Sequence, residues 1–287
     1  MSSEFSFIIL TYNEQEHLPR LLRSIEPLEA PVYILDSGST DDTLSIAENF
    51  GATIAQNPFK NHPEQWNYAL NCFTITTPWI IALDADQWLS EQLQKKLLDF
   101  RSTHLSSTIN GIYFNRKNYF RGEWIKYGGY YPKYLLKMFR KGKGRSDLNE
   151  NMDHRFIIEG ETTTWKDGII HEENFKENHI NFWISKHNRY SDLVAQEEIE
   201  RRQQIRHQAI KPKMFGSPDE RIAAYKKMWW KMPLYLRPFC YFFYRFFLQL
   251  GFLDGKQGRL FHFLQGFWFR MIVDMKIEEQ LKIEKSK

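Results

Sequence analysis

Short apolar runs alternate with helical patterns along the first 90 residues, and this alternation narrows the possible fold classes more than any other feature. The apolar runs fall at residues 5–10, 32–36, 51–55 and 79–83, and stretches with helical spacing separate them. Each run is apolar on both faces, which is typical of parallel strands that helices cover on either side. The sequence therefore predicts an α/β fold with a mainly parallel central sheet flanked by helices.

The helix that follows the second apolar run has candidate capping residues. Ser39 or Thr40 suits the N-cap, and Asp41 and Asp42 would then stand in the first helical turn. We expect the helix to begin at this point.

The pattern changes after residue 110. Less regular strands and polar loops follow and are expected to complete the sheet, and then a charged helix is expected at about 182–209. The segment PKMFGSPDE marks a break before a basic, aromatic tail. This organisation predicts three parts, at 1–110, 111–210 and 211–287, and the last of them is a helical tail.

Composition excludes several classes of protein. Hydrophobic residues make up 42% of the chain and charged residues 26%, which fits a globular core and excludes disorder, collagen and coiled coil. The two cysteines, Cys72 and Cys240, offer neither a disulfide scaffold nor a cysteine zinc site. The N-terminus lacks the pattern of a signal peptide, so we expect a cytoplasmic location.

Charge is unevenly distributed along the chain. Residues 1–200 hold 21 Lys and Arg against 28 Asp and Glu, whereas residues 201–287 hold 18 against 7, a net charge of +11. This basic tail is also rich in aromatic residues, and its apolar run at 239–250 is shorter than the roughly 20 residues of a spanning helix.

Two interpretations of the tail are open. It could associate with a membrane surface, with an aromatic side and a basic face. It could also pack on the body as a helical hairpin with its charges in solvent. Nucleic acid is a weaker candidate partner, because the acidic body would repel phosphates. The residues assigned to the basic face are Lys226, Lys227, Lys231, Arg237 and Arg245.

Polar residues follow the predicted parallel strands, and ligands bind at the carboxyl ends of such strands. Asp84 and Asp86 stand two residues apart at the end of the fourth run, so both carboxylates can point the same way and share a divalent cation. Such a cation can neutralise a diphosphate. The alternative is that these carboxylates cap a helix or form a turn. The other polar residues at this edge are Thr11, Tyr12, Asn13, Glu14 and Asp36.

Three segments in this order and spacing, FIILTYNEQEHLPRLLRSI, VYILDSGSTDDT and ALDAD, resemble the nucleotide-binding half of family 2 glycosyltransferases of the GT-A fold. Downstream, RGEWIKYGGYYPKYLLKMFRKGKGR, NENMDHRFIIEG and IIHE resemble the branch that contains the lipopolysaccharide-core glucosyltransferases.

The resemblance implies that residues 1–110 form the nucleotide-sugar-binding half and residues 111–210 the acceptor-binding half. It also implies roles on the donor side. Tyr12 would flank the base, Thr11, Asn13 and Glu14 would line the nucleoside pocket, and Asp36 would accept the imide N–H of uracil. Asp84 would contact the ribose or the donor sugar, and Asp86 would hold Mn²⁺ or Mg²⁺ against the phosphates. Gln87 departs from the family pattern, which commonly has glutamate there.

The acceptor side needs a base for the attacking hydroxyl. Glu150 is the first candidate and Asp153 the second, although Glu150 could also be an ordinary solvated acid. His171 could complete the metal shell or contact phosphate, or it could be structural. Further candidates, each with a structural alternative, are Lys186 and Arg189 for phosphate or acceptor and Trp124, with Tyr130 and Tyr131, for stacking on a sugar.

The leading hypothesis is a metal-dependent, inverting glycosyltransferase. It would move a sugar from a nucleotide diphosphate, UDP first of all, to a glycolipid or lipid-linked saccharide at the inner face of the cell membrane. One alternative is a polyprenyl-phosphate sugar synthase, which would not need a strong base. Another is a non-catalytic membrane scaffold that retains a sugar-nucleotide fold.

Overall fold

The computed structural model describes residues 3–101, 103, 105–148, 155–203, 205 and 210–285. The described residues divide into two compact units. Unit 1 takes them from Met1–Lys117, Pro132–Leu148 and His154–Asn174, and unit 2 takes them from Asn118–Tyr131 and Phe175–Lys287. The division of the chain into three consecutive parts stays an interpretation.

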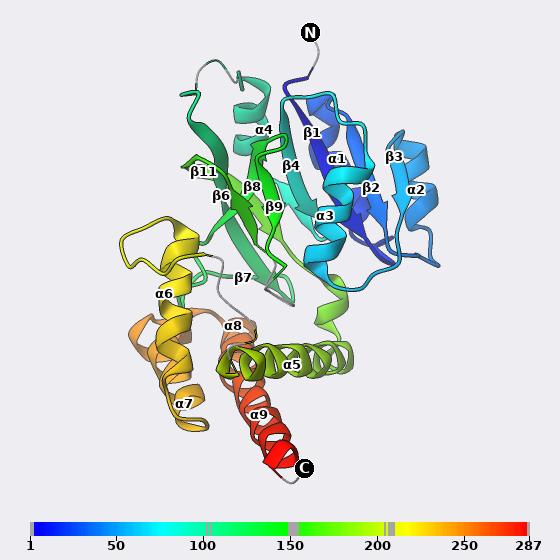
Figure 1. Cartoon of the computed structure of the whole chain (residues 1–287). Coiled ribbons are helices and arrows are strands. Elements are labelled where there is room, and N and C mark those ends of the chain that lie inside the picture. Colours follow the sequence, from blue (N-terminus) through cyan, green and yellow to red (C-terminus); the bar gives the residue numbers. More distant parts are fainter. Residues whose placement is uncertain are drawn as a thin grey trace. The chain divides into compact units, whose positions relative to one another are not determined.

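Unit 1 begins with the alternation expected from the sequence. Four parallel strands lie in the order β3-β2-β1-β4 (Figure 1), so the apolar runs do form the parallel part of a sheet. The elements are β1 (Phe5–Thr11), α1 (Leu18–Ile25), η1 (Glu26–Leu28), β2 (Val32–Asp36), α2 (Thr43–Phe50), β3 (Thr53–Gln56), α3 (His62–Cys72) and β4 (Trp79–Asp84).

The same sheet continues with strands that pair antiparallel to their neighbours. Beyond β4 the order is β8-β6-β11-β5, and β7 pairs with β6. A separate pair of strands is formed by β9 and β10. The elements are β5 (Gln87–Leu89), α4 (Glu91–Leu98), β6 (Ile109–Phe120), β7 (Glu123–Ile125), β8 (Tyr134–Arg140), β9 (Gly144–Ser146), β10 (Phe156–Ile158) and β11 (Glu161–Glu172).

Hydrophobic cores lie on both faces of this sheet. Along β1, Phe7 and Ile9 belong to one core cluster and Ile8 to another, as the alternation of side chains in a strand requires. The first cluster includes Leu21 of α1, and the second includes Trp66 of α3. Because burial on both sides demands apolar residues at every position, this arrangement explains the continuous apolar runs. The expected α/β class is confirmed.

The start of α2 corrects one prediction from the sequence. The helix begins at Thr43 and its N-cap is Asp42, so Asp41 and Asp42 do not stand in its first turn. Asp41 accepts hydrogen bonds from the backbone N–H and the hydroxyl of Thr43, at 3.0 and 2.5 Å. Ser39 and Thr40 are used elsewhere, because they bind Asp36 and Asn13.

Unit 2 is mainly helical. The charged helix expected at about 182–209 is present but ends earlier, at Arg202, and α6 begins at a capping box formed by Ser217 and Glu220. Among the described helices, none is both long and apolar enough to cross a membrane. The elements are η3 (Phe175–Asn178), α5 (Ile180–Arg202), α6 (Pro218–Trp230), α7 (Leu236–Phe243), η4 (Tyr244–Leu248), η5 (Gly251–Leu253), α8 (Lys256–Phe263), η6 (Leu264–Trp268) and α9 (Phe269–Lys285).

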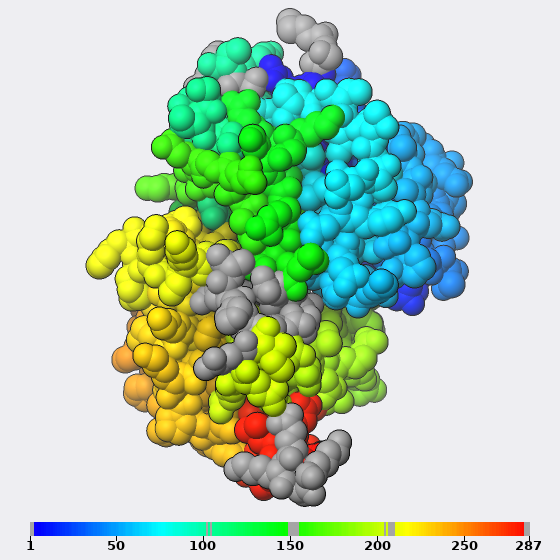
Figure 2. Space-filling view, viewed as in Figure 1, coloured from blue at the N-terminus to red at the C-terminus, as the bar shows by residue number. Residues whose placement is uncertain are grey.

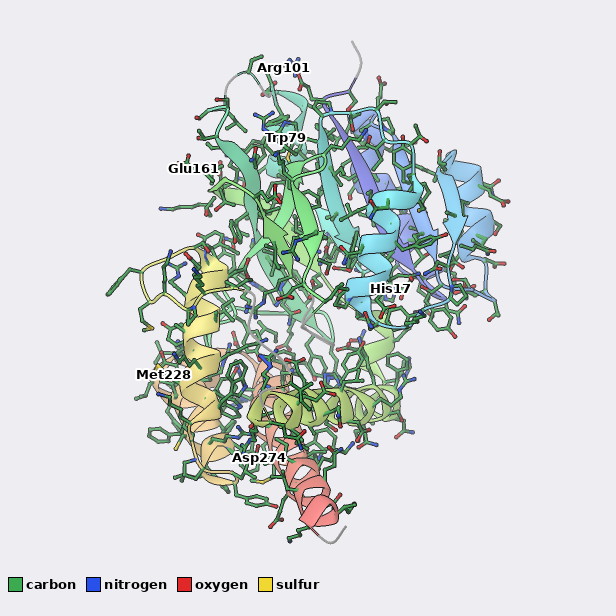
Figure 3. The ribbon with its side chains drawn as sticks, viewed as in Figure 1. His17, Trp79, Arg101, Glu161, Met228 and Asp274 are labelled. Atoms are coloured by element: carbon green, nitrogen blue, oxygen red, sulfur yellow. The ribbon has the colours of Figure 1, made fainter. Side chains whose placement is uncertain are left out.

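Two arginines assigned to a basic surface turn inward. Arg237 is fully buried and pairs with Glu198 and Asp274, at 2.7 and 2.5 Å. Figure 3 marks Asp274 on α9, beside α5. Arg245 lies over the ring of Tyr130, 4.1 Å from its centroid. The basic face predicted from the sequence is therefore wrong for these two residues, because acidic partners from other helices hold Arg237 inside and the ring of Tyr130 covers Arg245.

Candidate active site

The carboxyl ends of β1, β2 and β4 meet at one edge of the sheet. In the pairing register Thr11 is opposite Asp36, and Leu10 is opposite Asp84. The sequence prediction that these polar residues share an edge is therefore correct in its geometry. Figure 3 marks His17, which follows the β1 loop, at this edge.

Asp36 organises the loop after β2. It is fully buried, and one of its oxygens accepts from the hydroxyls of Thr11 (2.9 Å) and Ser39 (2.5 Å). The other oxygen accepts from the backbone N–H groups of Gly38 (2.8 Å) and Ser39 (2.7 Å). Four donors fill the usual capacity of a carboxylate, so Asp36 fixes the shape of this loop.

The loop after β1 is joined to the loop after β2. Asn13 has a left-handed backbone with φ of 53°, and its side-chain oxygen accepts from the N–H of Thr40 at 2.7 Å. The N–H of Glu14 donates to the hydroxyl of Thr43, and the Glu14 carboxylate lies 2.5 Å from Nδ1 of the buried His17. Next to these fixed residues, Tyr12 is 58% exposed. It can therefore present a flat apolar surface to a ligand.

Asp84 has a partner that the sequence analysis missed. The ammonium group of Lys137 donates to its Oδ2 atom at 2.8 Å, and the lysine is almost fully buried. Lys137 stands in the middle of β8, within the apolar sequence YLLKMF. A lysine inside a buried strand needs an anionic partner, and that requirement was the available signal.

Asp86 follows β4 and is held by α1 and by the two residues directly after β11. Its backbone oxygen accepts from the N–H of Glu173 (3.1 Å) and from the guanidinium of Arg20 (3.1 Å). Its Oδ2 atom accepts from the side-chain amide of Asn174 at 3.2 Å. Arg20 also forms an ion pair with Glu173 at 3.4 Å. The backbone of Asp86 is thus held from two sides, and Asn174 contacts its carboxylate.

Gln87 stands where the family pattern commonly has glutamate, and the hydrogen bonds of its side chain explain why an amide suits this position. Its side-chain oxygen accepts from the N–H of Asp84 (3.2 Å), and its side-chain amide donates to Glu172 (2.7 Å). Glu172 in turn pairs with Arg116 at 2.6 Å. An amide can both donate and accept, whereas a glutamate at position 87 would place two carboxylates in contact.

His171 stacks on Trp88, with ring centroids 5.0 Å apart. The guanidinium of Arg20 lies 3.8 Å from the centroid of the same indole ring. Burial lowers the pKa of His171 to about 4, helped by the positive charges of Lys117 and Arg20. The imidazole is therefore neutral near pH 7, which is the form that can ligate a metal. His171, Trp88 and Arg20 line a cavity of about 610 Å³.

The donor set suits a cation that arrives with a diphosphate. Among the described residues, no group of three or more His, Cys, Asp or Glu side chains is arranged to hold a metal ion. Mg²⁺ in nucleotide sites is commonly bound by one or two carboxylates together with substrate phosphates and water. Asp86 can supply such a carboxylate at this edge. The metal roles of Asp86 and His171 remain predictions.

The candidate acceptor residues are less well defined by the structure. Glu150 and Asp153 lie outside the described residues. Lys186 pairs with Glu177 at 2.6 Å, and Arg189 is exposed on the same helix, α5. Trp124 packs edge-on against Tyr131, with centroids 5.0 Å apart. The acceptor roles of these residues stay predictions.

Comparison with known proteins identifies the family. The model of Glycosyl transferase family 2 matches residues 6–157, which is more than half of the chain. The chain belongs to glycosyl transferase family 2. This membership agrees with the fold class and the enzyme class expected from the sequence: the family 2 chain is a glycosyltransferase.

Curated relatives include a lipopolysaccharide enzyme. The family 2 chain is 28% identical over 206 residues to the lipopolysaccharide core biosynthesis glycosyltransferase LpsC of Rhizobium meliloti. This alignment covers 68% of this chain and 72% of LpsC. It is 31% identical over 104 residues to an uncharacterized glycosyltransferase of Rickettsia conorii, and that alignment spans 36% of either chain.

Solved structures show more distant likeness. A fragment of S. aureus TarS covers 99% of this family 2 chain and 92% of its own length, with 15% identity and a TM-score of 0.47. Glucosyl-3-phosphoglycerate synthase from Mycobacterium tuberculosis, solved with Mn²⁺, UDP and glucosyl-3-phosphoglycerate, covers 41% of this chain and 44% of its own, with 21% identity and a TM-score of 0.31.

Proposed function

We propose that this chain is a metal-dependent, inverting glycosyltransferase that moves a sugar from UDP to a glycolipid or lipid-linked saccharide of the cell envelope. The observation that carries the proposal is the shared edge of β1, β2 and β4, which gathers Asp36, Asp84 and Asp86. Ligands of α/β sheets bind at the carboxyl ends of the strands. Similarity to LpsC supports a lipopolysaccharide acceptor.

The nucleoside would lie on the two joined loops. Tyr12 offers its exposed ring to the base. Asp36 would accept the imide N–H of uracil only if one of its four present donors moved, and the hydroxyl of Ser39 is the donor with most freedom to rotate away. In this proposal Asp36 both shapes the pocket and recognises the base.

The diphosphate would lie between Asp84 and Asp86. A bound Mn²⁺ or Mg²⁺ supplies charge that stabilises the departing diphosphate. Asp86 would hold the cation, and His171, neutral because of its low pKa of about 4, has a lone pair to offer. Lys137 holds the Asp84 carboxyl group in place, so that this group can accept hydrogen bonds from ribose or sugar hydroxyls.

The acceptor hydroxyl would attack the anomeric carbon on the side opposite the diphosphate, which inverts the configuration there. Glu150 would take the hydroxyl proton, with Asp153 as the second candidate. A lipid-linked acceptor would be presented at a membrane surface. Trp124, Lys186 and Arg189 would contact the acceptor or phosphate.

Calorimetric titration of UDP into the purified chain tests the proposal. We expect saturable binding of UDP that requires Mn²⁺ or Mg²⁺. In Asp86→Asn we expect that adding the metal no longer strengthens UDP binding. Asp99→Asn is the matched control, since Asp99 is an exposed acid at the end of α4. Absence of saturable binding by the wild type would overturn the proposal in favour of a scaffold.

A second measurement separates the transferase from a polyprenyl-phosphate sugar synthase. Glu150→Gln should lower the rate of sugar transfer about 100-fold or more, because a hydroxyl nucleophile needs a general base. Near-complete activity in this variant would favour a phosphate acceptor.

A further inference from the structure

The helical segment formed by α7 and η4 in unit 2 is amphipathic, but its charged side faces inward and its apolar side faces outward. A surface helix normally turns its apolar side inward and its charges to solvent. Here the two charged residues, Arg237 and Arg245, turn inward to Glu198, Asp274 and Tyr130. The outward side carries no charge.

The outward residues follow helical spacing. They recur every three or four positions along Leu236–Leu248, so they form one continuous stripe. Five of them are large apolar residues with 48–65% of their surface exposed, namely Leu236, Phe239, Phe243, Phe247 and Leu248. Cys240 and Tyr244 lie on the same stripe and are also exposed. We call this stripe the apolar face.

Neighbouring elements extend the apolar face. Phe252 and Leu253 of η5 and Phe263 of α8 are 41–51% exposed. Ring contacts join them to the helix: Phe246 lies 6.3 Å from Phe252, and Phe242 lies 6.4 Å from Phe263, between centroids. Figure 2 shows the gold-coloured part of this segment on the surface of unit 2. An exposed apolar patch of this extent marks an interaction surface.

The charge around the apolar face is positive. Between Leu236 and Arg270 the sequence contains one acidic residue, Asp254. That residue is buried, where it accepts from the N–H groups of Lys126 and Tyr127 and lies 2.7 Å from His262 Nε2. The exposed charges of the same segment are Lys256 and Arg259, directly after η5. An apolar face with two exposed cations beside it matches acyl chains below anionic headgroups.

We propose that the apolar face of α7 and η4, together with η5 and Phe263, inserts into the outer part of an anionic phospholipid monolayer. Lys256 and Arg259 would meet the headgroups. Arg237 and Arg245 would stay inside unit 2 and keep the helix fixed while its apolar face enters the lipid. The inference rests on the proposed function only for the lipid nature of the acceptor, which such docking would bring to the enzyme.

The two cysteines allow a direct test on the full chain. Cys240 lies on the apolar face, whereas Cys72 is exposed on α3 of unit 1 and serves as the control. A polarity-sensitive fluorophore on Cys240, in the Cys72→Ser variant, should shift to shorter wavelength when phosphatidylglycerol vesicles are added. The same fluorophore on Cys72, in Cys240→Ser, should not shift. Equal behaviour of the two probes would contradict the proposal.

Substitutions test the same surface without a label. Phe243→Ser/Phe247→Ser should weaken partition into phosphatidylglycerol vesicles by about tenfold or more. Phe59→Ser/Leu98→Ser, two residues that are equally exposed in unit 1, should leave partition unchanged. Lys256→Glu/Arg259→Glu should weaken binding about tenfold on these vesicles at low salt and have no effect on phosphatidylcholine vesicles.

The result that overturns the inference is vesicle binding that Phe243→Ser/Phe247→Ser leaves intact. If the same variant changed the molar mass by light scattering, the apolar face would be a contact between copies of the chain instead. UDP titration of Phe243→Ser/Phe247→Ser distinguishes failure of the membrane proposal from failure of the catalytic proposal. Retained UDP binding with lost vesicle binding supports both, whereas absent UDP binding by wild type with intact vesicle binding refutes only the catalytic one.

Discussion

Lys137 donates a hydrogen bond to Asp84 from inside the sheet, with Nζ 2.8 Å from Oδ2. The lysine side chain is 4% exposed and the aspartate side chain 32% exposed. The carboxylate thus faces the site edge, while the ammonium group that balances it is buried. This pairing gives the candidate site a fixed anion without leaving the lysine uncompensated.

Asp84→Asn should therefore cost stability as well as activity. Removal of one partner leaves the Lys137 ammonium buried without an anion, and we expect a loss of about 3 kcal/mol in the free energy of unfolding. Urea unfolding followed by tryptophan fluorescence measures the change.

The double variant Asp84→Asn/Lys137→Met distinguishes this cause from others. Methionine fills the volume of the lysine stem without charge, so stability should largely return while sugar transfer stays impaired. If Asp84→Asn alone were as stable as wild type, the ion pair would not form in solution.

Gln87→Glu tests how the site accommodates its departure from the family pattern. The new carboxylate would meet Glu172, whose Oε2 atom now accepts from the Gln87 amide at 2.7 Å. Two carboxylates in contact resist ionisation, so the variant should lose about 1–3 kcal/mol of stability at pH 7.5. The loss should shrink at pH 5, where one carboxyl can hold a proton. Thermal unfolding at the two pH values measures it, and an equal loss at both would contradict the explanation.

The sequence was a good guide wherever short-range patterns decide the structure. The runs that end at Leu10, Asp36 and Asp84 are apolar on both faces, and that requirement of a covered parallel sheet is visible residue by residue. Since parallel strands share one carboxyl edge, the gathering of Thr11, Asp36 and Asp84 could be predicted without coordinates.

The sequence analysis misplaced or missed residues whose partners lie far away along the chain. Arg237 and Arg245 were assigned to a basic face, but Glu198 and Asp274, each more than 35 positions from Arg237, hold Arg237 inside unit 2. Lys137 was overlooked because its partner stands 53 positions away. The start of α2 was misplaced because Ser39 hydrogen-bonds Asp36 and so cannot cap the helix.

His171 gives the protein a predictable pH dependence. Its folded pKa of about 4 lies below the ordinary value of 6.5, because of burial and the nearby charges of Lys117 and Arg20. Between these values the unfolded chain binds a proton that the folded chain does not, so stability should rise as pH increases from about 4 to 6.5 and then level off. Because His171 is only partly buried, solvent screening reduces the contribution to about 1–2 kcal/mol.

His171→Phe isolates this contribution. Phenylalanine can keep the stack on Trp88 but cannot titrate, so the slope of stability against pH should decrease between pH 4 and 6.5 while stability at pH 7.5 changes little. Unfolding by urea at a series of pH values measures the slope. An unchanged slope would mean that another group is responsible.

The buried cluster of Arg237, Glu198 and Asp274 should be the most sensitive point of unit 2. Arg237→Ala would leave two carboxylates buried side by side without their shared cation, at a cost of about 3–5 kcal/mol in the free energy of unfolding. Arg259→Ala, which removes an exposed arginine of α8, is the matched control and should change stability by about 0.5 kcal/mol or less. Because the cluster also orients α7, Arg237→Ala should reduce binding to anionic vesicles along with stability, while Arg259→Ala should reduce only the binding.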